Sequence, residues 1–120
     1  MVSREAIDGA IAAHGQWRKR LEEAIAQGTS EWRVSVVQKD DACHLGQWLR
    51  SLLPGDRAAD HFEQVMRLHA EFHETAAQIL DLALRGAQPD AAQRMEFGNE
   101  YTLASGRLVL ALNRWKNSLP

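Results

Sequence analysis

The sequence has a single cysteine, few prolines and no long apolar run. One cysteine among 120 residues excludes an internal disulfide, and so little cysteine fits a reducing compartment. No apolar stretch approaches the roughly 20 residues that cross a bilayer. Glu5 and Asp8 stand where a secretion signal has basic and apolar residues. We therefore expect a soluble, cytoplasmic protein without membrane insertion.

An excess of charge of one sign is also missing. The chain has 14 Lys and Arg against 16 Asp and Glu, a formal net charge of −2, and its basic residues are scattered. Nucleic-acid binding normally needs a basic patch, so we expect no nucleic-acid partner. The length and an ordinary share of hydrophobic residues, 45%, predict one globular domain over residues 1–120.

Apolar residues recur at helical spacing almost throughout the chain, which predicts an all-α fold. A first helix is expected from a Ser3 cap to Gly28. A short second helix is expected to begin at an acidic cap, Asp40 or Asp41, and to end before Pro54. It buries a face made of Leu45, Trp48, Leu49 and Leu52.

The second half of the chain predicts two further helices. The third is capped by Asp56, runs to about Arg85 and ends at Gly86. It has an apolar stripe of Phe62, Met66, His69, His73, Ala76, Ala77, Leu80 and Leu84. The fourth begins near Pro89, since proline suits the first turn of a helix. It carries Met95, Tyr101, Thr102, Leu108, Val109, Leu112 and Trp115.

Three long helices plus one shorter helix predict an antiparallel four-helix bundle. Residues 29–40 are rich in β-favouring side chains but have no partner strand elsewhere in the chain. We therefore expect them to form an extended connection that covers one end of the bundle core.

Three histidines fall on the predicted apolar stripes, and the cysteine lies near the start of the short helix. Alone, His14, Cys43 or the His69/His73 pair is more simply explained as a core or surface residue. Together they favour a metal site, because one ion satisfies three buried imidazoles and a thiolate at once. The donor set of one sulfur and three nitrogens is typical of Zn²⁺.

The two other histidines have no such placement. His44 follows Cys43 directly and points about 100° away on a helix, and His61 is out of register with His69. We expect both to lie at the surface.

Three other functions are alternatives to a closed zinc site. A di-iron centre needs inward carboxylates in Glu-x-x-His spacing, and none of the three stripe histidines has a Glu three residues before it. Nucleophilic catalysis by Cys43 would need an orienting acid and an oxyanion-binding loop, neither of which is identifiable. The main alternative is a metal-free structural or dimerisation bundle, with Trp32, Trp115 and the fourth helix as its dimer face.

Three segments resemble the signatures of the chemoreceptor zinc-binding (CZB) domain family: residues 14–17 (HGQW), 43–49 (CHLGQWL) and 69–73 (HAEFH). The resemblance runs from about Ala6 to about Trp115. It implies a four-helix bundle with one zinc ion in its core, bound by His14, Cys43, His69 and His73.

The resemblance also implies a function. Members of this family are cytoplasmic sensory domains, commonly homodimers, that respond to zinc availability or to oxidants such as hypochlorous acid. They regulate an output module in cis or in trans, either a chemoreceptor signalling region in chemotaxis or a diguanylate cyclase. The chain is therefore expected not to be an enzyme, since four protein ligands leave no open position for catalysis. Cys43, as the only redox-active ligand, is expected to be the switch, with Trp17 and Trp48 walling off the site.

Overall fold

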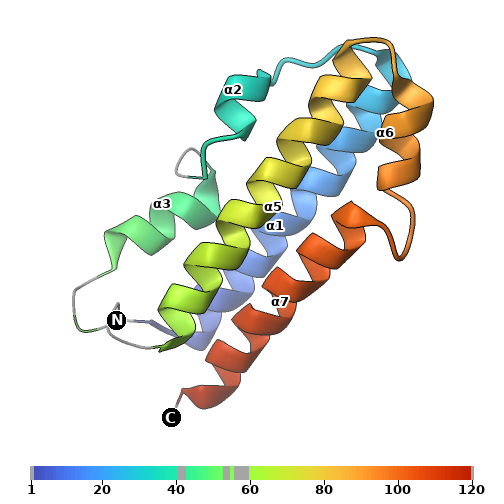
Figure 1. Ribbon diagram of the computed structural model, residues 1–120. Coiled ribbons are helices and arrows are strands. Elements are labelled where there is room, and N and C mark those ends of the chain that lie inside the picture. The colour runs from blue at the N-terminus through green and yellow to red at the C-terminus, as the bar shows by residue number, and fades with distance from the viewer. Residues whose placement is uncertain (1, 41–42, 53–54, 56–59, 120) are drawn as a thin grey trace.

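The computed structural model describes residues 2–40, 43–52, 55 and 60–119, and every regular element within these residues is a helix. The predicted all-α class is therefore confirmed. Figure 1 shows the elements in chain order, which are α1 (Arg4–Gln27), α2 (Val34–Val37), α3 (His44–Ser51), α5 (Asp60–Leu84), α6 (Gln88–Arg94) and α7 (Glu100–Ser118).

The long helices α1, α5 and α7 lie side by side along a molecule with principal extents of 47 × 26 × 20 Å (Figure 1). α1 and α5 run in the same direction and α7 runs back against them. α5 contacts every other labelled helix, so it is the central element. Both chain ends lie at one end of the molecule, where Lys116 Nζ is 2.9 Å from Asp8 Oδ1.

The first helix has the predicted ends. The Ser3 hydroxyl accepts a hydrogen bond from the Ala6 amide at 3.1 Å, which is a side-chain N-cap. Gly28 ends α1 with φ 71°, and its amide donates to the Ala24 carbonyl. Glycine suits this left-handed position because it has no Cβ to clash with the backbone.

The short helix starts later than predicted, and its expected acidic cap is wrong. α3 begins at His44 with Cys43 as its N-cap, and Cys43 Sγ accepts from the Gly46 amide at 3.3 Å. Asp40 lies before the helix and pairs with Arg50 at 3.5 Å, while Asp41 lies outside the described residues. A sulfur therefore does the capping that a carboxylate was expected to do.

The connection over residues 29–40 is not wholly extended as predicted. Val34–Val37 form one helical turn, α2, in which the Arg33 carbonyl accepts from the amides of Val36 and Val37. Val37 is buried against the core. The β-preference of valine depends on neighbouring strands, and without a partner strand the local hydrogen bonds determine the conformation.

The predicted fourth helix is two helices. α6 ends at Arg94 and α7 begins at Glu100, with Gly98 between them at φ 87°. The Gly98 amide donates to the Thr102 hydroxyl at 2.8 Å. The left-handed backbone at Gly98 interrupts the helix, and an apolar stripe that resumes after the turn hides this break in the sequence.

The third helix is close to its prediction. α5 ends at Leu84, and Gly86 follows with φ 86°. The expected cap, Asp56, lies outside the described residues. Most of the predicted stripe is buried, but Leu84 is 38% exposed, so the last turn extends beyond the core.

The core is continuous, and it includes Trp115. This side chain is buried and packs against Trp48 and Phe62, with ring centroids 5.6 and 6.3 Å apart. Trp115 therefore cannot belong to a dimer face, as the sequence had suggested. Trp32 is partly buried and packs against Trp17, with ring centroids 5.1 Å apart.

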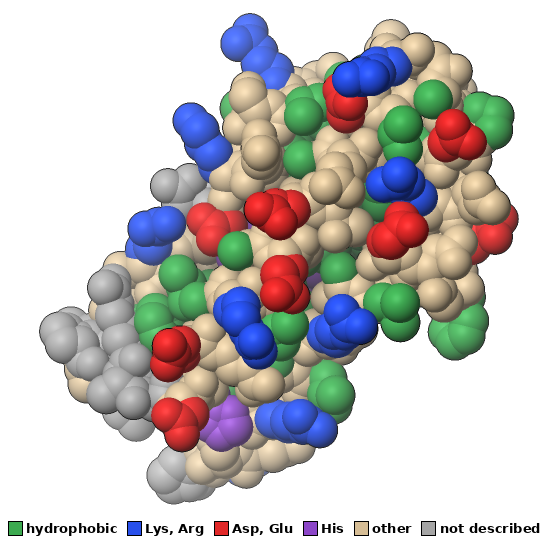
Figure 2. Space-filling view, viewed as in Figure 1, with side chains coloured by type: hydrophobic (Ala, Val, Ile, Leu, Met, Phe, Trp, Pro, Cys, Tyr) green, Lys and Arg blue, Asp and Glu red, His purple; other side chains and the backbone are tan. Residues whose placement is uncertain are grey.

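No helix among the described residues is both long and apolar enough to span a bilayer. Acidic and basic side chains are interspersed on the face seen in Figure 2, without a large patch of one sign.

Tyr101 predicts an alkaline loss of stability. Burial raises its pKa to about 12, although the Arg18 guanidinium 5.1 Å from the ring centroid opposes the rise. Above the unfolded value of about 10, the unfolded chain loses the phenol proton while the folded chain keeps it. The free energy of unfolding should therefore fall by about 2–3 kcal/mol between about pH 10 and 12.

Tyrosinate absorbance measures this directly, since the chain has one tyrosine. The folded protein should titrate near pH 12, and the same protein in urea near its ordinary value of about 10. A folded midpoint equal to the urea midpoint would contradict the prediction.

Candidate metal centre

Helix α5 brings two of the sequence-predicted ligands together. His69 and His73 are one helical turn apart on its buried face, each 1% exposed, with ring centroids 4.5 Å apart. Residues four apart lie above one another on a helix, so both rings face the same region. The pair therefore forms one side of a site in the core.

The N-terminus of α3 supplies a third group. Cys43 Sγ lies 3.2 Å from His69 Nε2 and 3.3 Å from His73 Nε2. These three ligand atoms all lie within 4.8 Å of one another, a spacing that can hold a metal ion. Cys43 is the N-cap of α3, and this end of α3 lies beside the two histidines, so the sulfur is close to α5.

The donor geometry fits zinc. Zn–S of about 2.3 Å and Zn–N of about 2.0–2.1 Å at a tetrahedral angle place sulfur and nitrogen about 3.6 Å apart. The two observed S···N distances are only slightly shorter. They are also compatible with thiol–imidazole hydrogen bonds, so the distances alone do not require an ion.

A backbone carbonyl fixes the orientation of His73. His73 Nδ1 lies 2.8 Å from the Val37 carbonyl, which can only accept a hydrogen bond. Nδ1 therefore carries the proton, and the lone pair of Nε2 is left facing Cys43. This contact depends on α2, the helical turn that replaced the predicted extended connection.

His14 is placed differently from the other three. It is buried on α1 and lines a small cavity of about 90 Å³ together with Cys43 and His69. It is not part of the close group of three, and its Nε2 lies 2.9 Å from the Ser105 hydroxyl of α7. The Phe72 ring packs edge-on against it at 4.3 Å. His14 thus borders the centre, although its nitrogens lie farther away.

Aromatic side chains cover one side of the centre. Trp17, 4% exposed, meets His73 edge-on at 5.5 Å. The Arg20 guanidinium lies over both Trp17 and Trp32, at 4.7 and 4.6 Å from the ring centroids. Trp17 therefore does shield the site, as predicted. Trp48 instead packs against Trp115, with ring centroids 5.6 Å apart.

Burial keeps the histidines neutral. It lowers the pKa of His14 to about 4 and that of His69 to about 3, helped in both by the neighbouring His73. Burial also lowers the pKa of His73, against the opposing effects of the Val37 hydrogen bond and Asp40. Neutral imidazole is the form that binds metals, so all three rings are in the ligand form near neutral pH.

The protonation state of Cys43 depends on two opposing effects, because burial favours the neutral thiol and the helix N-terminus favours the thiolate. Burial raises the pKa of the thiol, and this outweighs the lowering by hydrogen bonds from the backbone around Gly46 and Leu45. The free-energy cost of burying a charged sulfur is larger than the stabilisation of the thiolate by the helix N-terminus. A cation at the centre would reverse this balance by pairing with the thiolate.

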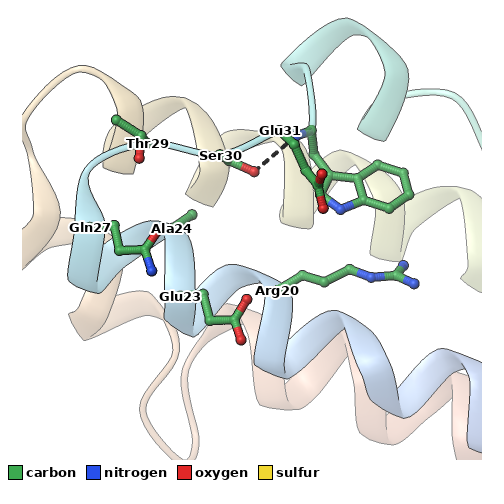
Figure 3. Close-up of a pocket in the computed structure, with 8 residues that line it drawn as sticks. Arg20, Glu23, Ala24, Gln27, Thr29, Ser30 and Glu31 are labelled. Atoms are coloured by element: carbon green, nitrogen blue, oxygen red, sulfur yellow. Dashed lines mark hydrogen bonds between the residues drawn. The ribbon is translucent and has the colours of Figure 1, made fainter.

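One surface hollow lies apart from the metal centre. It has a volume of about 500 Å³ and is lined by residues of α1 and the following loop, including Arg20, Glu31 and Trp32 (Figure 3). None of the four predicted ligands lines it. Its lining holds charges of both signs.

The remaining histidines lie outside the group. His44 is exposed, as predicted, and His61 is partly buried rather than fully at the surface. Sequence reasoning missed Val37 and Ser105, the partners of His73 and His14. A backbone carbonyl carries no sequence signal, and one serine on a distant helix has no distinguishing spacing.

Together these observations define a protein that is helical throughout its described regular elements and has a Cys/His group, with both histidines buried and Cys43 partly buried, that can hold a metal ion. The family model of the chemoreceptor zinc-binding domain matches residues 14–80, more than half of the chain. The chain belongs to this family, a family of zinc-binding sensory domains, as the sequence motifs had indicated. No curated protein and no solved structure matches the sequence.

Proposed function

We propose that this chain is a single regulatory domain over residues 1–120 that binds one zinc ion through His14, Cys43, His69 and His73. The observation that carries the proposal is the double role of Cys43. Its sulfur lies against two imidazoles of α5 and at the same time caps α3. A chemical change at this one atom therefore acts on both the ion and the start of a helix.

Four protein ligands would leave no position for water or substrate, which supports a regulatory rather than an enzymatic role. A bound zinc ion would hold the sulfur as thiolate. His73 is preset for this by its hydrogen bond to Val37, and the buried rings exclude competing protons near neutral pH. Zinc availability, or an oxidant that removes the thiolate, is the signal.

Hypochlorous acid is the proposed oxidant. The Cys43 thiolate attacks its chlorine and hydroxide leaves. Water then displaces chloride from sulfur and loses a proton, giving sulfenic acid. The sulfur is oxidised and the chlorine is reduced to chloride. A sulfenic acid is a poorer metal ligand than a thiolate, so zinc is released and α3 loses its tie to α5.

The domain regulates an output module in cis or in trans, which is a chemoreceptor signalling region or a diguanylate cyclase. It acts in the cytoplasm, as a homodimer. Support for a second copy is the apolar exposure near and on α7, where Phe97 is 99%, Leu103 48% and Leu110 51% exposed. We also propose an antiparallel four-helix bundle. α2 and α3, which come between α1 and α5 in the chain and lie to one side of them, would together take the place of the second helix (Figure 1).

The test is zinc content before and after oxidation. The purified protein should contain about one zinc per chain. One equivalent of hypochlorite should release it as Cys43 gains oxygen, measured with a zinc indicator and by mass spectrometry. His44→Ala, which changes an exposed histidine, should behave like the parent.

Two results would count against the proposal. Zinc that stays bound after Cys43 is oxidised would exclude the redox switch. A protein without zinc, whose melting temperature is unchanged by chelation, would support the metal-free bundle instead. The short S···N distances would then be thiol–imidazole hydrogen bonds.

A further inference from the structure

Ser105 lies beside His14 but outside the segment that matches the family, residues 14–80. It is on α7, and its hydroxyl is 2.9 Å from His14 Nε2. We propose that Ser105 is a positioning residue that holds the His14 ring by Nε2 and so presents Nδ1 to the zinc. Because this role requires His14 to be a ligand, it rests on the function proposed above.

The geometry of the imidazole ring supports this assignment. The two ring nitrogens point to opposite sides, so the ring can contact α7 with one and the metal centre with the other. Nε2 is engaged by Ser105, which leaves Nδ1 for an ion. His14 also lines the same small cavity as Cys43 and His69, so its ring already borders the space that the ion would fill.

His73 shows the same arrangement with the nitrogens exchanged. Its Nδ1 is held by the Val37 carbonyl, and its Nε2 faces Cys43 Sγ at 3.3 Å. Histidine ligands of metals commonly donate their second N–H to a carbonyl, carboxylate or water, which fixes the tautomer and the ring plane. In the proposal Ser105 takes the place that the Val37 carbonyl has at His73 by accepting from His14 Nε2–H, although a hydroxyl, unlike a carbonyl, can also donate.

A movement of His14 is still needed, because neither of its nitrogens lies in the close group of three. Phe72 limits this movement, because its ring packs against the His14 ring with the two centroids 4.3 Å apart. For Nδ1 to reach an ion the ring must move toward the Cys/His group, and the hydrogen bond to Ser105 can be kept during this movement, since a serine hydroxyl can rotate to follow. Zinc binding is thereby linked to α7, the helix that carries exposed Leu103 and Leu110.

The first test is zinc affinity, measured by competition with a chromophoric chelator. Ser105→Ala should weaken binding by at least about tenfold, the usual cost of losing a partner of a metal ligand. Ser105→Thr keeps the hydroxyl and should restore most of the affinity. Ser118→Ala removes an exposed hydroxyl from the same helix and should have no effect.

The second test is the histidine tautomers of the zinc-loaded protein, read from long-range ¹H–¹⁵N correlation spectra. We expect the proton of His14 on Nε2 and that of His73 on Nδ1. A proton on Nδ1 of His14 would overturn the proposal. Unchanged or tighter zinc binding by Ser105→Ala would do the same, and tighter binding would mean that Ser105 competes with the ion for Nε2.

His14→Ala separates this proposal from the proposed function. If His14→Ala leaves zinc affinity unchanged, the four-ligand site itself is wrong. If His14→Ala weakens binding but Ser105→Ala does not, only the role of Ser105 is wrong.

Discussion

Replacing Cys43 with serine is expected to weaken zinc binding by about two orders of magnitude while leaving the metal-free fold intact. Structural zinc sites bind with about 10–16 kcal/mol from four ligands, so one ligand accounts for about 3 kcal/mol, or about 100-fold. Serine is a preferred N-cap, and its hydroxyl can accept from the Gly46 amide in place of the sulfur. The change therefore removes the metal ligand but keeps the helix cap.

Competition with a chelator measures the affinity, and urea unfolding in excess chelator measures the metal-free stability. Cys43→Ala is the companion variant, because it removes both the ligand and the cap. It should lose the same zinc affinity and a further ~1 kcal/mol of metal-free stability. His44→Ala, at the exposed neighbour, should leave both quantities unchanged. Parent-like zinc affinity in Cys43→Ser would refute the assignment of Cys43 as a ligand.

Replacing Phe72 with alanine should cause the largest loss of stability, about 3–5 kcal/mol. Phe72 is fully buried, and its ring lies between His14, His73 and Tyr101 at centroid distances of 4.3, 5.5 and 5.5 Å. Its removal leaves a cavity at the crossing of α1, α5 and α7, and it frees two imidazole rings from their packing. A loss of this size is a large fraction of the stability of a small domain.

Urea unfolding in the presence of chelator isolates this effect from metal binding. Phe97→Ala is the matched control, measured at a protein concentration at which the chain is monomeric. Phe97 is 99% exposed on the single chain, so the same substitution there should change the free energy of unfolding by no more than about 0.5 kcal/mol. Equal effects at the two phenylalanines would contradict the packing described around Phe72.

Features of the fold that depend on strong local sequence signals were predicted well. Ser3 and Gly28 end α1 as expected, because a side-chain cap and a left-handed glycine act within a few residues of the helix end. The periodicity of α5 placed His69 and His73 on one buried face, since both depend only on the helical repeat. The all-α class and the family followed from the same local patterns.

The errors arose where tertiary contacts compete with local preference. Valine-rich residues 34–37 form a helical turn because the part of the chain that the structure describes has no strand to pair with them. The predicted fourth helix is broken at Gly98, where one backbone angle interrupts a pattern that looks continuous. The exposed dimer-face role of Trp115 failed because α3 and α5 cover this side chain, with Trp48 and Phe62 against it.

The sequence by itself determined which residues can bind a metal, since donor chemistry belongs to the side chain and helical spacing puts His69 beside His73. Only the tertiary structure decided how each donor is held. It put Cys43 Sγ against both rings, the Val37 carbonyl on His73 and the Ser105 hydroxyl on His14. These contacts join segments 26 to 91 residues apart, and no local pattern encodes the packing that brings them together.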